Sequence, residues 1–399
     1  MSFNLARRME YIRASEIREL LKLTQQPHII SFAGGMPAPE AFPLEEFKQI
    51  SKEVLENYGT IALQYGPTEG YFPLREAIAK RMKKMSVDVE AENILVTSGS
   101  QQGLDFAAKI FINPGDIIVC ESPTYLGAIN AFRAYEPRFV EVPTDDFGMD
   151  MNALEEVLKN NDNVKFIYVI PDFQNPSGRT WSVERRKQLV ELANKYNVVI
   201  IEDNPYGELR FEGEILPAIK HFDTEGRVAF LGTFSKILCP GFRLGWVAAD
   251  KELLNKFILV KQGADLQSST ISQIETALYL QKYDLDAHIK KITSIYKHRR
   301  DVMMDAIKEE FPDVVKYTYP NGGLFTWIVL PEYINARELA VKALEYNVAY
   351  VPGGSFFPNG GNENTARLNY SNMNDDKIRE GIRSLGKVIK EALTKEALA

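Results

Sequence analysis

The 399-residue sequence contains very little cysteine and histidine, and this scarcity argues against several kinds of site. Cys120 and Cys239 are its two cysteines, and they do not form a CxxC pair. The four histidines do not show the spacing of metal ligands. We therefore predict no metal site, and we interpret these side chains as structural or surface residues.

The sequence also lacks a large excess of one charge and any long apolar run. Lys and Arg number 47, Asp and Glu number 54, and no basic block is present, which disfavours nucleic acid as a partner. No segment approaches the ~20 apolar residues of a membrane span. Charged residues are scattered through the first twenty positions and interrupt the apolar run that a secretory signal needs. We expect no membrane partner and a cytoplasmic location.

The remaining composition is that of a soluble globular protein. Hydrophobic residues make up 45% and charged residues 25% of the sequence. Because domains commonly contain roughly 100–200 residues, a chain of this length is expected to form two structural units.

Apolar runs alternate with amphipathic stretches from about residue 93 onward. The runs cover residues 93–99, 116–123, 164–172, 197–205, 227–235 and 243–250. Helical patterns lie between them, for example at 101–111 and at 182–196, where Ser182 is a plausible N-cap. This alternation predicts an α/β domain with a mainly parallel sheet, whose ligands bind beyond the carboxyl ends of the strands.

The pattern changes after Asp250 to helical stretches at 251–262 and 272–311. Shorter strand-like segments follow at 321–330 and 347–354. We predict a large domain at 46–289 and a second unit that combines residues 1–45 with a small α+β domain at 290–399.

Polar residues follow the predicted strands at the edge where a site is expected. They are Ser98 to Gln102, Tyr125, Asn175 to Gly178, Asp203 with Tyr206, and Ser235 and Lys236 with Arg243. Their repeated position after apolar runs is the main functional signal in the pattern.

Each of these residues also has an ordinary interpretation when it is taken alone. The helix start at Ser100 suits a phosphate but equally suits a simple cap, and Asp203 could serve a turn. Lys236 could extend to solvent. As a set, they match a ligand with a phosphate, a ring nitrogen that needs an anion and an aldehyde that needs an amine. Pyridoxal phosphate is such a ligand, and lysine forms Schiff bases with carbonyls.

The motifs TSGSQQG, NPSG, EDNPYGEL, FSKILCPGFRLGW and RLNY occur in this order along the chain. With these motifs the sequence resembles the fold type I pyridoxal-phosphate-dependent aminotransferases of class I/II. The segments SFAGGMPAPEAFP and LQYGPTEG resemble the branch of the 2-aminoadipate and kynurenine aminotransferases. The resemblance implies a large cofactor-binding domain, with a mainly parallel central sheet flanked by helices, and a smaller α+β C-terminal domain.

The resemblance also implies a role for each matching residue. Lys236 would bond covalently to the cofactor and move a proton, Asp203 would pair with the ring nitrogen, and Tyr206 and Asn175 would donate to the phenolic oxygen. The remaining cofactor contacts would be Ser100, Gln101, Ser235 and Arg243 at the phosphate, Tyr125 against the ring, and Tyr65 at the phosphate of a second subunit. A homodimer with shared active sites follows from this last role.

The substrate contacts implied by the resemblance are fewer. Arg367, helped by Asn175, would bind the substrate α-carboxylate, and Gly35 would lie beside the substrate. Arg18 matches an arginine that contacts the distal carboxylate of acidic substrates, although it could equally be a solvent-exposed helix residue.

The resulting hypothesis is an aminotransferase with amino acid and 2-oxo acid substrates. The donor would be 2-aminoadipate or an aromatic or branched-chain amino acid, the acceptor 2-oxoglutarate, and the mechanism ping-pong. A decarboxylase or C–S lyase could use the same Lys236 and Asp203. A transcription regulator that joins this domain to a winged-helix module is disfavoured, because the pattern begins almost at Met1 and no basic footprint accompanies it.

Overall fold

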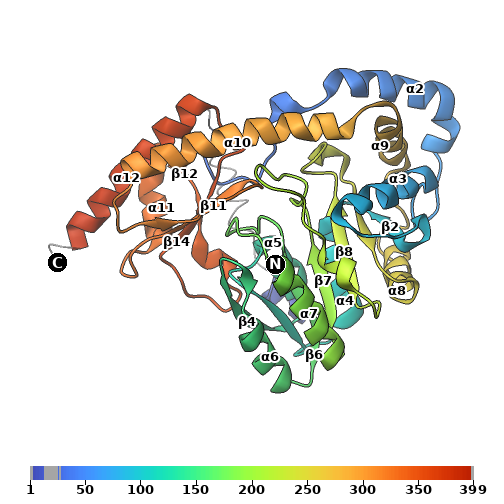
Figure 1. Cartoon of the computed structure of the whole chain (residues 1–399), viewed down its shortest axis with the longest axis horizontal. Helices are drawn as coiled ribbons and strands as arrows, with labels where there is room; N and C mark the ends of the chain where they lie inside the picture. Colours follow the sequence, from blue (N-terminus) through green and yellow to red (C-terminus); the bar gives the residue numbers. More distant parts are fainter. Residues whose placement is uncertain (1–2, 13–25, 27, 397–399) are drawn as a thin grey trace.

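The computed structural model describes residues 3–12, 26 and 28–396, and Figure 1 shows their arrangement. A large sheet with its helices forms one part of the molecule, and a smaller sheet with the C-terminal helices forms the other. Helix α10 (Leu285–Glu310) runs along one edge of both parts, from α2 (Leu44–Ala62) and α9 (Thr270–Lys282) toward α12 (Asp375–Glu396) (Figure 1).

The large sheet has eight strands in the order β2-β9-β8-β7-β6-β3-β4-β5. Pairing is parallel from β8 through β7, β6 and β3 to β4, while β9 runs antiparallel to both of its neighbours. The strands are β2 (Ile94–Thr97), β3 (Ile117–Ser122), β4 (Arg138–Asp145), β5 (Gly148–Met149), β6 (Val164–Val169), β7 (Val199–Asp203), β8 (Val228–Thr233) and β9 (Gly245–Ala248).

Both faces of this sheet are covered, which explains why its strands read as continuous apolar runs. Alternate residues of β3 and β6 point to opposite faces. Ile118 and Phe166 join a core cluster with helices α4 (Ser100–Phe111) and α5 (Leu126–Arg133). Ile117 and Ile167 join a second cluster with α6 (Met151–Lys159) and α7 (Val183–Tyr196).

The smaller sheet is antiparallel and has the strand order β10-β11-β14-β13. A separate parallel pair joins β1, near the start of the described chain, to β12. These strands are β1 (Ile30–Ser31), β10 (Lys316–Tyr317), β11 (Phe325–Val329), β12 (Val348–Ala349), β13 (Val351–Pro352) and β14 (Thr365–Asn369). The N-terminal segment therefore pairs with the C-terminal part of the chain.

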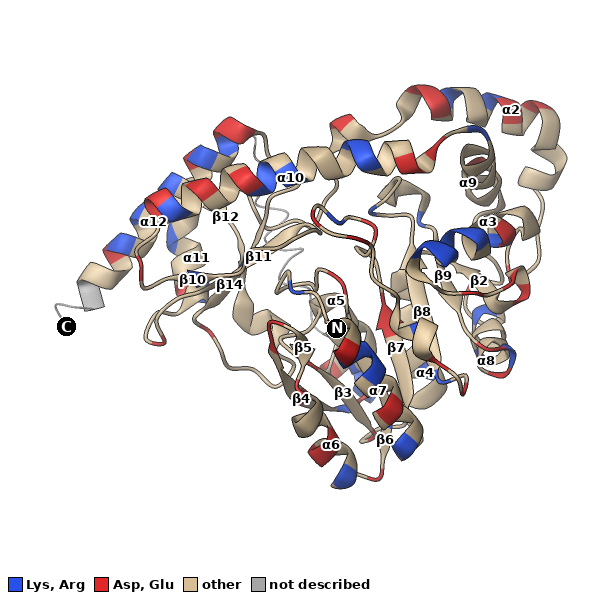
Figure 2. Ribbon diagram, in the orientation of Figure 1, with Lys and Arg blue, Asp and Glu red and all other residues tan. Residues whose placement is uncertain are grey.

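The remaining helices belong to the same two parts of the molecule. They are α3 (Phe72–Met82), α8 (Lys251–Gln262) and α11 (Ala336–Glu345), together with the 3-10 turns Arg7–Glu10, Pro39–Ala41, Lys83–Met85, Ala91–Asn93, Ile219–Phe222, Pro240–Phe242 and Gly353–Phe356. None of the helices in the described residues is both long and apolar enough to cross a membrane. Charges of both signs are mixed along α10 and α12 (Figure 2).

The structure confirms the predicted fold class, an α/β sheet flanked by helices with a smaller α+β part. All six apolar runs contain strands, and Ser182 is the N-cap of α7, where its hydroxyl accepts from the Arg185 N–H at 3.2 Å. Helix α10 passes residue 290 without a break, so the division of the chain at that residue stays a prediction.

One helical stretch and several strands, namely β1, β4, β5, β10 and β14, differ from the sequence interpretation. The helical stretch 272–311 is two helices, because Asp284 caps α10 by accepting from the N–H groups of Asp286 and Ala287. Strand β4 was not predicted. Its sequence RFVEVPTD contains a proline and charged residues, and most of its side chains are partly or fully exposed near one edge of the sheet.

Candidate active site

A cavity of about 270 Å³ lies beyond the carboxyl ends of the parallel strands. Residues from the large sheet, from the smaller sheet and from the segment after β1 line it together. The lining residues are Gly35, Ser100, Gln101, Tyr125, Ile170, Asn175, Asp203, Pro205, Tyr206, Thr233, Ser235, Lys236, Pro240, Arg243, Phe325 and Arg367. The cavity thus occupies the position that α/β sheets use for ligands.

Lys236 lies three residues after the end of β8 and is partly buried. Its Nζ donates a hydrogen bond to the carbonyl oxygen of Gly35 at 2.7 Å. Burial lowers the pKa of Lys236 to about 8, helped by the nearby positive charges of Arg367 and Arg243. A substantial fraction of the amine is therefore neutral near physiological pH and available as a nucleophile or base.

Asp203 is the last residue of β7 and is almost completely buried. Its Oδ2 accepts a hydrogen bond from the hydroxyl of Tyr168 at 2.9 Å, while Oδ1 has no partner among the described residues. Burial raises the pKa of Asp203 to about 7, and the bond from Tyr168 opposes this rise. A buried carboxylate oxygen without a partner suits a ligand that brings a cationic N–H group.

The amino end of α4 and the side chain of Arg243 form a cradle for an anion. Gly99 is the residue before α4, with a φ of +83°, and a Cβ placed on it would lie 2.5 Å from Nη2 of Arg243. Backbone N–H groups at a helix start and a guanidinium are a common combination for phosphate. Gln101 uses its side-chain amide to donate to the Gly127 carbonyl at 2.8 Å, which leaves its backbone N–H for a ligand.

Two hydroxyl groups adjoin this cradle. Ser100 is the first residue of α4, and Ser235 precedes Lys236. The Ser235 hydroxyl lies 3.0 Å from the Thr233 hydroxyl, which also reaches the Leu244 carbonyl at 3.2 Å. Both serines line the cavity, and a hydroxyl can donate to a phosphate oxygen.

Arg367 extends from β14 into the same cavity and is buried. Its Nη1 donates to Oδ1 of Asn175 at 2.8 Å, its Nη2 donates to the Ala33 carbonyl, and its Nε has no partner among the described residues. Phe325 and Phe356 lie against the guanidinium, with ring centres 4.2 and 5.2 Å from Cζ. Burial lowers the pKa of Arg367 to about 10, so the group remains cationic at neutral pH. This fixed planar cation suits a carboxylate.

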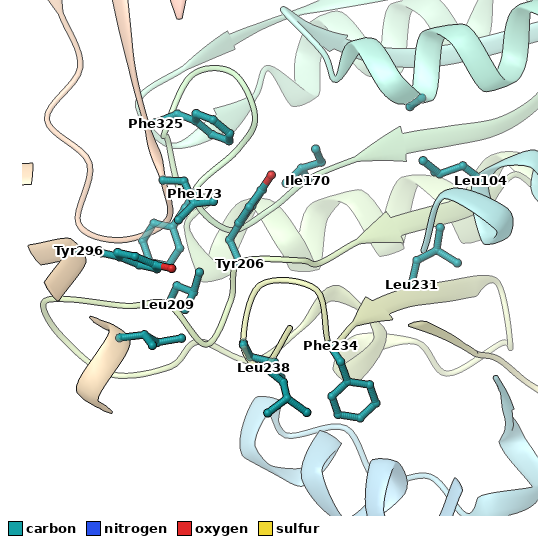
Figure 3. Packing of buried hydrophobic residues seen from close by; sticks show 14 of the residues in the cluster. Leu104, Ile170, Phe173, Tyr206, Leu209, Leu231, Phe234, Leu238, Tyr296 and Phe325 are labelled. Carbon is teal, nitrogen blue, oxygen red and sulfur yellow. The ribbon is translucent and has the colours of Figure 1, made fainter. Parts of the chain in front are cut away.

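Aromatic side chains shape the rest of the cavity. Tyr206 and Phe325 pack edge to face with ring centres 5.9 Å apart, and the Tyr206 hydroxyl points toward the space between Phe325 and Ile170 (Figure 3). The amide of Asn175 donates to this hydroxyl at 3.4 Å. Tyr125 is the residue before α5 and is partly buried, and burial raises its pKa.

The buried carboxylate of Asp172 connects the loops that contain Asn175 and Tyr206, and it is also paired with Arg186 on α7. Arg186 makes two hydrogen bonds to Asp172, at 2.8 and 3.1 Å, and both side chains are buried. Asn204 donates to the same carboxylate at 3.0 Å and accepts from the Gly207 N–H. The loop after β6 is thereby tied to the loop after β7, which fixes the relative position of the site residues on each.

The structure brings most of the sequence-predicted site residues together. Eleven of them line the cavity: Gly35, Ser100, Gln101, Tyr125, Asn175, Asp203, Tyr206, Ser235, Lys236, Arg243 and Arg367. Tyr65 does not line it and is 78% exposed on the surface. Arg18 lies outside the described residues.

Sequence reasoning did not identify five lining residues, namely Ile170, Pro205, Thr233, Pro240 and Phe325. Phe325 begins a strand and has the pattern of an ordinary core residue. The pair Gly322-Gly323 just before it is the one local signal, because glycines permit a close approach of backbone.

The arrangement can bind a ligand with four distinct chemical groups. The cradle suits a phosphate, the free oxygen of Asp203 suits a protonated ring nitrogen, and the amine of Lys236 suits a carbonyl carbon. Arg367, which reaches the same cavity from β14, suits a carboxylate.

Comparison with known proteins agrees with this chemistry. The sequence model for aminotransferase class I and II matches residues 28–385. The chain is 51% identical to an aromatic-amino-acid aminotransferase of Thermococcus litoralis over 389 residues, which cover 96% of this chain and 93% of the relative. It is 44% identical over 385 residues to a 2-aminoadipate transaminase of Thermus thermophilus, with 96% and 95% covered.

A solved structure shows the same likeness in three dimensions. The kynurenine aminotransferase of Pyrococcus horikoshii, crystallised in complex with PMP, superimposes with a TM-score of 0.94 at 45% identity, and 98% of each chain is covered. The chain therefore belongs to the class I and II aminotransferases, and it is an enzyme whose cofactor is pyridoxal phosphate.

Proposed function

We propose that the enzyme transfers the amino group of an L-amino acid to a 2-oxo acid, with 2-oxoglutarate as the acceptor, by a ping-pong mechanism. The observation that supports this most directly is the position of Arg367 in the same cavity as Lys236. Donor and acceptor in such a reaction share an α-carboxylate. A single buried guanidinium with an unpaired Nε can therefore bind each of them in turn.

The residues of the cavity fit the cofactor. We assign its phosphate to Ser100, Gln101, Ser235 and Arg243, its ring nitrogen to Oδ1 of Asp203, its phenolic oxygen to Asn175 and Tyr206, and its ring face to Tyr125. The unpartnered Oδ1 and the cradle at Gly99 are the structural observations behind this assignment. When bound, pyridoxal phosphate supplies a carbonyl that accepts the amino group and a ring that withdraws electrons.

Lys236 has two tasks in this proposal. Its amine would hold the cofactor covalently in the resting enzyme, and it would be a free amine once the substrate amino group is bound in its place. The free Nζ, whose pKa is lowered to about 8, can take the proton from the substrate Cα and later return it as an acid. Gly35 supports both tasks, because its carbonyl oxygen accepts from Nζ and keeps the amine within the cavity.

Asp203 and Arg367 hold the reactants on either side of this amine. An ionised Asp203 favours the protonated ring nitrogen, which increases the withdrawal of electrons from the substrate. Arg367 orients the α-carboxylate by two parallel hydrogen bonds, and its contact with Asn175 fixes the plane of the guanidinium.

A donor panel tests the reaction. Purified enzyme is incubated with 2-oxoglutarate and single amino acids, and glutamate is measured together with carbon dioxide, ammonia and released thiols. Glutamate formation supports the proposal. Carbon dioxide, or ammonia with thiol, in place of glutamate would instead indicate the decarboxylase or C–S lyase.

The proposed donors are 2-aminoadipate and aromatic or branched-chain amino acids. Relatives that are named for aromatic and 2-aminoadipate substrates support the first two classes. We propose Arg18 as the contact for a distal carboxylate, on the basis of the sequence resemblance. The donor panel is therefore repeated with Arg18→Ala, which should lose 2-aminoadipate activity and retain activity toward aromatic donors. An equal loss for both classes would contradict this role.

We also propose that the enzyme works as a homodimer in which Tyr65 contacts the phosphate in the second subunit's site. Tyr65 is 78% exposed. The apolar side chains of Leu63 and Ile61 nearby in sequence are also exposed, at 75% and 56%. The backbone beside Tyr65 is held in place, because Gly66 N–H donates to Gln267 and the Thr270 hydroxyl donates to the carbonyl of Gln64. An exposed aromatic and aliphatic surface on a fixed backbone is typical of an interface.

A further inference from the structure

Tyr168 has no role in the mechanism described above, yet its hydroxyl contacts the residue at the centre of the site. It lies on β6, next to β7, and the register pairs it with Ile201. Because side chains two residues apart share a face of a strand, Tyr168 and Asp203 lie on the same face of the sheet. The hydroxyl donates to Oδ2 of Asp203 at 2.9 Å.

The direction of this hydrogen bond is determined by chemistry. When Asp203 is ionised its carboxylate only accepts, so the Tyr168 hydroxyl is the donor. It is the one hydrogen bond of this hydroxyl among the described residues. The bond occupies Oδ2 and leaves Oδ1 without a partner in the cavity that Asp203 lines.

The ring of Tyr168 is itself held rigidly. Its side chain is fully buried, and its ring packs edge to face against Phe132 of α5 with ring centres 5.4 Å apart. Phe132 packs in the same manner against Phe166, at 5.3 Å. A hydroxyl on a ring that cannot move provides a fixed donor for the carboxylate.

We propose that Tyr168 is a positioning residue, which holds Asp203 ionised and turned so that its second oxygen faces the ring nitrogen of the cofactor. This inference rests on the proposed role of Asp203 in cofactor binding. Tyr168 acts through Asp203 and contacts neither substrate nor cofactor.

The first test measures the affinity of the apoenzyme for pyridoxal 5′-phosphate in Tyr168→Phe, which removes one oxygen and keeps the ring. Since hydrogen bonds to charged groups contribute strongly, the affinity should fall by about tenfold or more. Tyr350→Phe is the matched control, because that tyrosine is equally buried and donates to the Ala336 carbonyl away from the cavity. Its affinity should not change.

A double-mutant cycle separates positioning from packing. Asp203→Asn should also weaken cofactor binding, and adding Tyr168→Phe to it should cause no further loss. If Tyr168→Phe lowers the cofactor affinity by the same factor in the parent enzyme and in Asp203→Asn, Tyr168 acts only through packing and the proposal is overturned. If Asp203→Asn binds normally, the assigned role of Asp203 is wrong. If Asp203→Asn binds weakly but Tyr168→Phe binds normally, only the inference about Tyr168 fails.

A second readout does not involve the cofactor. Infrared titration of the apoenzyme, with Asp203→Asn as the blank, reports the pKa of the Asp203 carboxyl. A donor to the ionised form lowers this pKa, so Tyr168→Phe should raise it by about one unit or more. The other ionisable groups near Asp203 and Tyr168 are unchanged in the variant: Glu121, Tyr125, Tyr206, Lys236, Arg243 and Arg367. An unchanged pKa overturns the proposal.

If Tyr168→Phe does not fold, the same titration is made on apoenzyme in which 3-fluorotyrosine replaces tyrosine. The fluorinated phenol is a stronger donor of nearly the same shape. The pKa of Asp203 should then fall below that of the unlabelled protein, and a pKa that stays the same contradicts the proposed hydrogen bond.

Discussion

Lys236 and Gly35 are joined by a hydrogen bond of 2.7 Å although they lie 201 positions apart in the chain. Gly35 follows β1, which pairs with the C-terminal part of the molecule, whereas Lys236 follows a strand of the large sheet. The same segment offers the Ala33 carbonyl to Arg367. One stretch of backbone after β1 thus contacts both the amine and the guanidinium of the site.

Replacement of the lysine tests its proposed role directly. Lys236→Ala should bind pyridoxal phosphate without forming a covalent bond, so borohydride should trap no cofactor on the protein. Loss of the general base should lower turnover by about a thousandfold or more. Mass spectrometry of the reduced protein provides the measurement, and Lys251→Ala, on the surface of α8, is the control. Trapping at another lysine in Lys236→Ala would show that the assignment is wrong.

The pH dependence of cofactor attachment follows from the lowered pKa of Lys236, which is about 8. Only the neutral amine attacks a carbonyl, so the rate of attachment to apoenzyme should rise with pH and level off above about 8. Arg367→Gln removes a positive charge that disfavours the ammonium form. The pKa of Lys236 should therefore rise, and the profile should move to higher pH.

Stopped-flow absorbance of pyridoxal phosphate bound to apoenzyme measures this profile. Arg227→Gln, beyond the far end of β8, is the control and should leave the profile unchanged. A profile that Arg367→Gln does not move would contradict the electrostatic coupling between Arg367 and Lys236.

The site could largely be predicted from the sequence because its residues follow buried strands, and parallel strands end at one edge of a sheet. Asp203, at the end of β7, and Lys236, just after β8, are examples. Their meeting with Arg367 could not be derived from pattern. It depends on the packing of two sheets whose residues are far apart in sequence, and the family resemblance supplied it instead.

Residues that contact the site residues from the core could not be predicted either, and the reason is different. Tyr168 lies inside an apolar run, and Phe356 reads as a core residue, so neither pattern distinguishes a contact with Asp203 or Arg367 from ordinary packing. Their roles depend on which neighbour each side chain contacts. Strand register determines this for Tyr168, and the packing of the 3-10 turn Gly353–Phe356 determines it for Phe356. The unpredicted strand β4, next to the edge strand β5, shows the same limit, because pairing with β3 stabilises it despite a weak strand pattern.

The phosphate cradle predicts that Gly99→Ala weakens cofactor binding. The new Cβ would lie 2.5 Å from Nη2 of Arg243 and would have to displace the guanidinium. The backbone at Gly99, with a φ of +83°, would add about 1–3 kcal/mol of strain. The affinity of apoenzyme for pyridoxal phosphate should fall at least about tenfold.

Gly115→Ala is the matched control for this variant. Its φ of +91° imposes a similar backbone strain, but nothing lies within 4 Å of the added Cβ. Both variants should be less stable in thermal denaturation, while only Gly99→Ala should bind the cofactor weakly. Equal affinities would remove the support for an anion cradle at Arg243.

The proposed dimer predicts that a charge at Leu63 disrupts assembly. Leu63 is 75% exposed beside Tyr65, so Leu63→Asp should not affect an isolated subunit but should place an unpaired charge in the interface. Light scattering should show monomers, with weaker cofactor binding because Tyr65 no longer reaches the second site. Val341→Asp changes a residue on α11 that is 66% exposed and should remain dimeric. A dimer in Leu63→Asp would contradict the proposed surface.

The buried pair of Asp172 and Arg186 predicts a large loss of stability when its charge balance is broken. Asp172→Asn leaves the Arg186 cation in a site where its side chain is 0% exposed. Removing one partner of a buried pair costs about 3–5 kcal/mol, since the remaining charge cannot reach water. Denaturant unfolding of the apoenzyme should show this decrease in the free energy of unfolding. Asp145→Asn is the control, because its bond to Arg185 is much more exposed and should contribute less than about 1 kcal/mol.

The Asp172 carboxylate also accepts from Asn204, so Asp172→Asn should loosen the loop that positions Tyr206. Folded Asp172→Asn should therefore bind the cofactor more weakly. Similar free energies of unfolding for Asp172→Asn and Asp145→Asn would refute the structural role assigned to the buried pair.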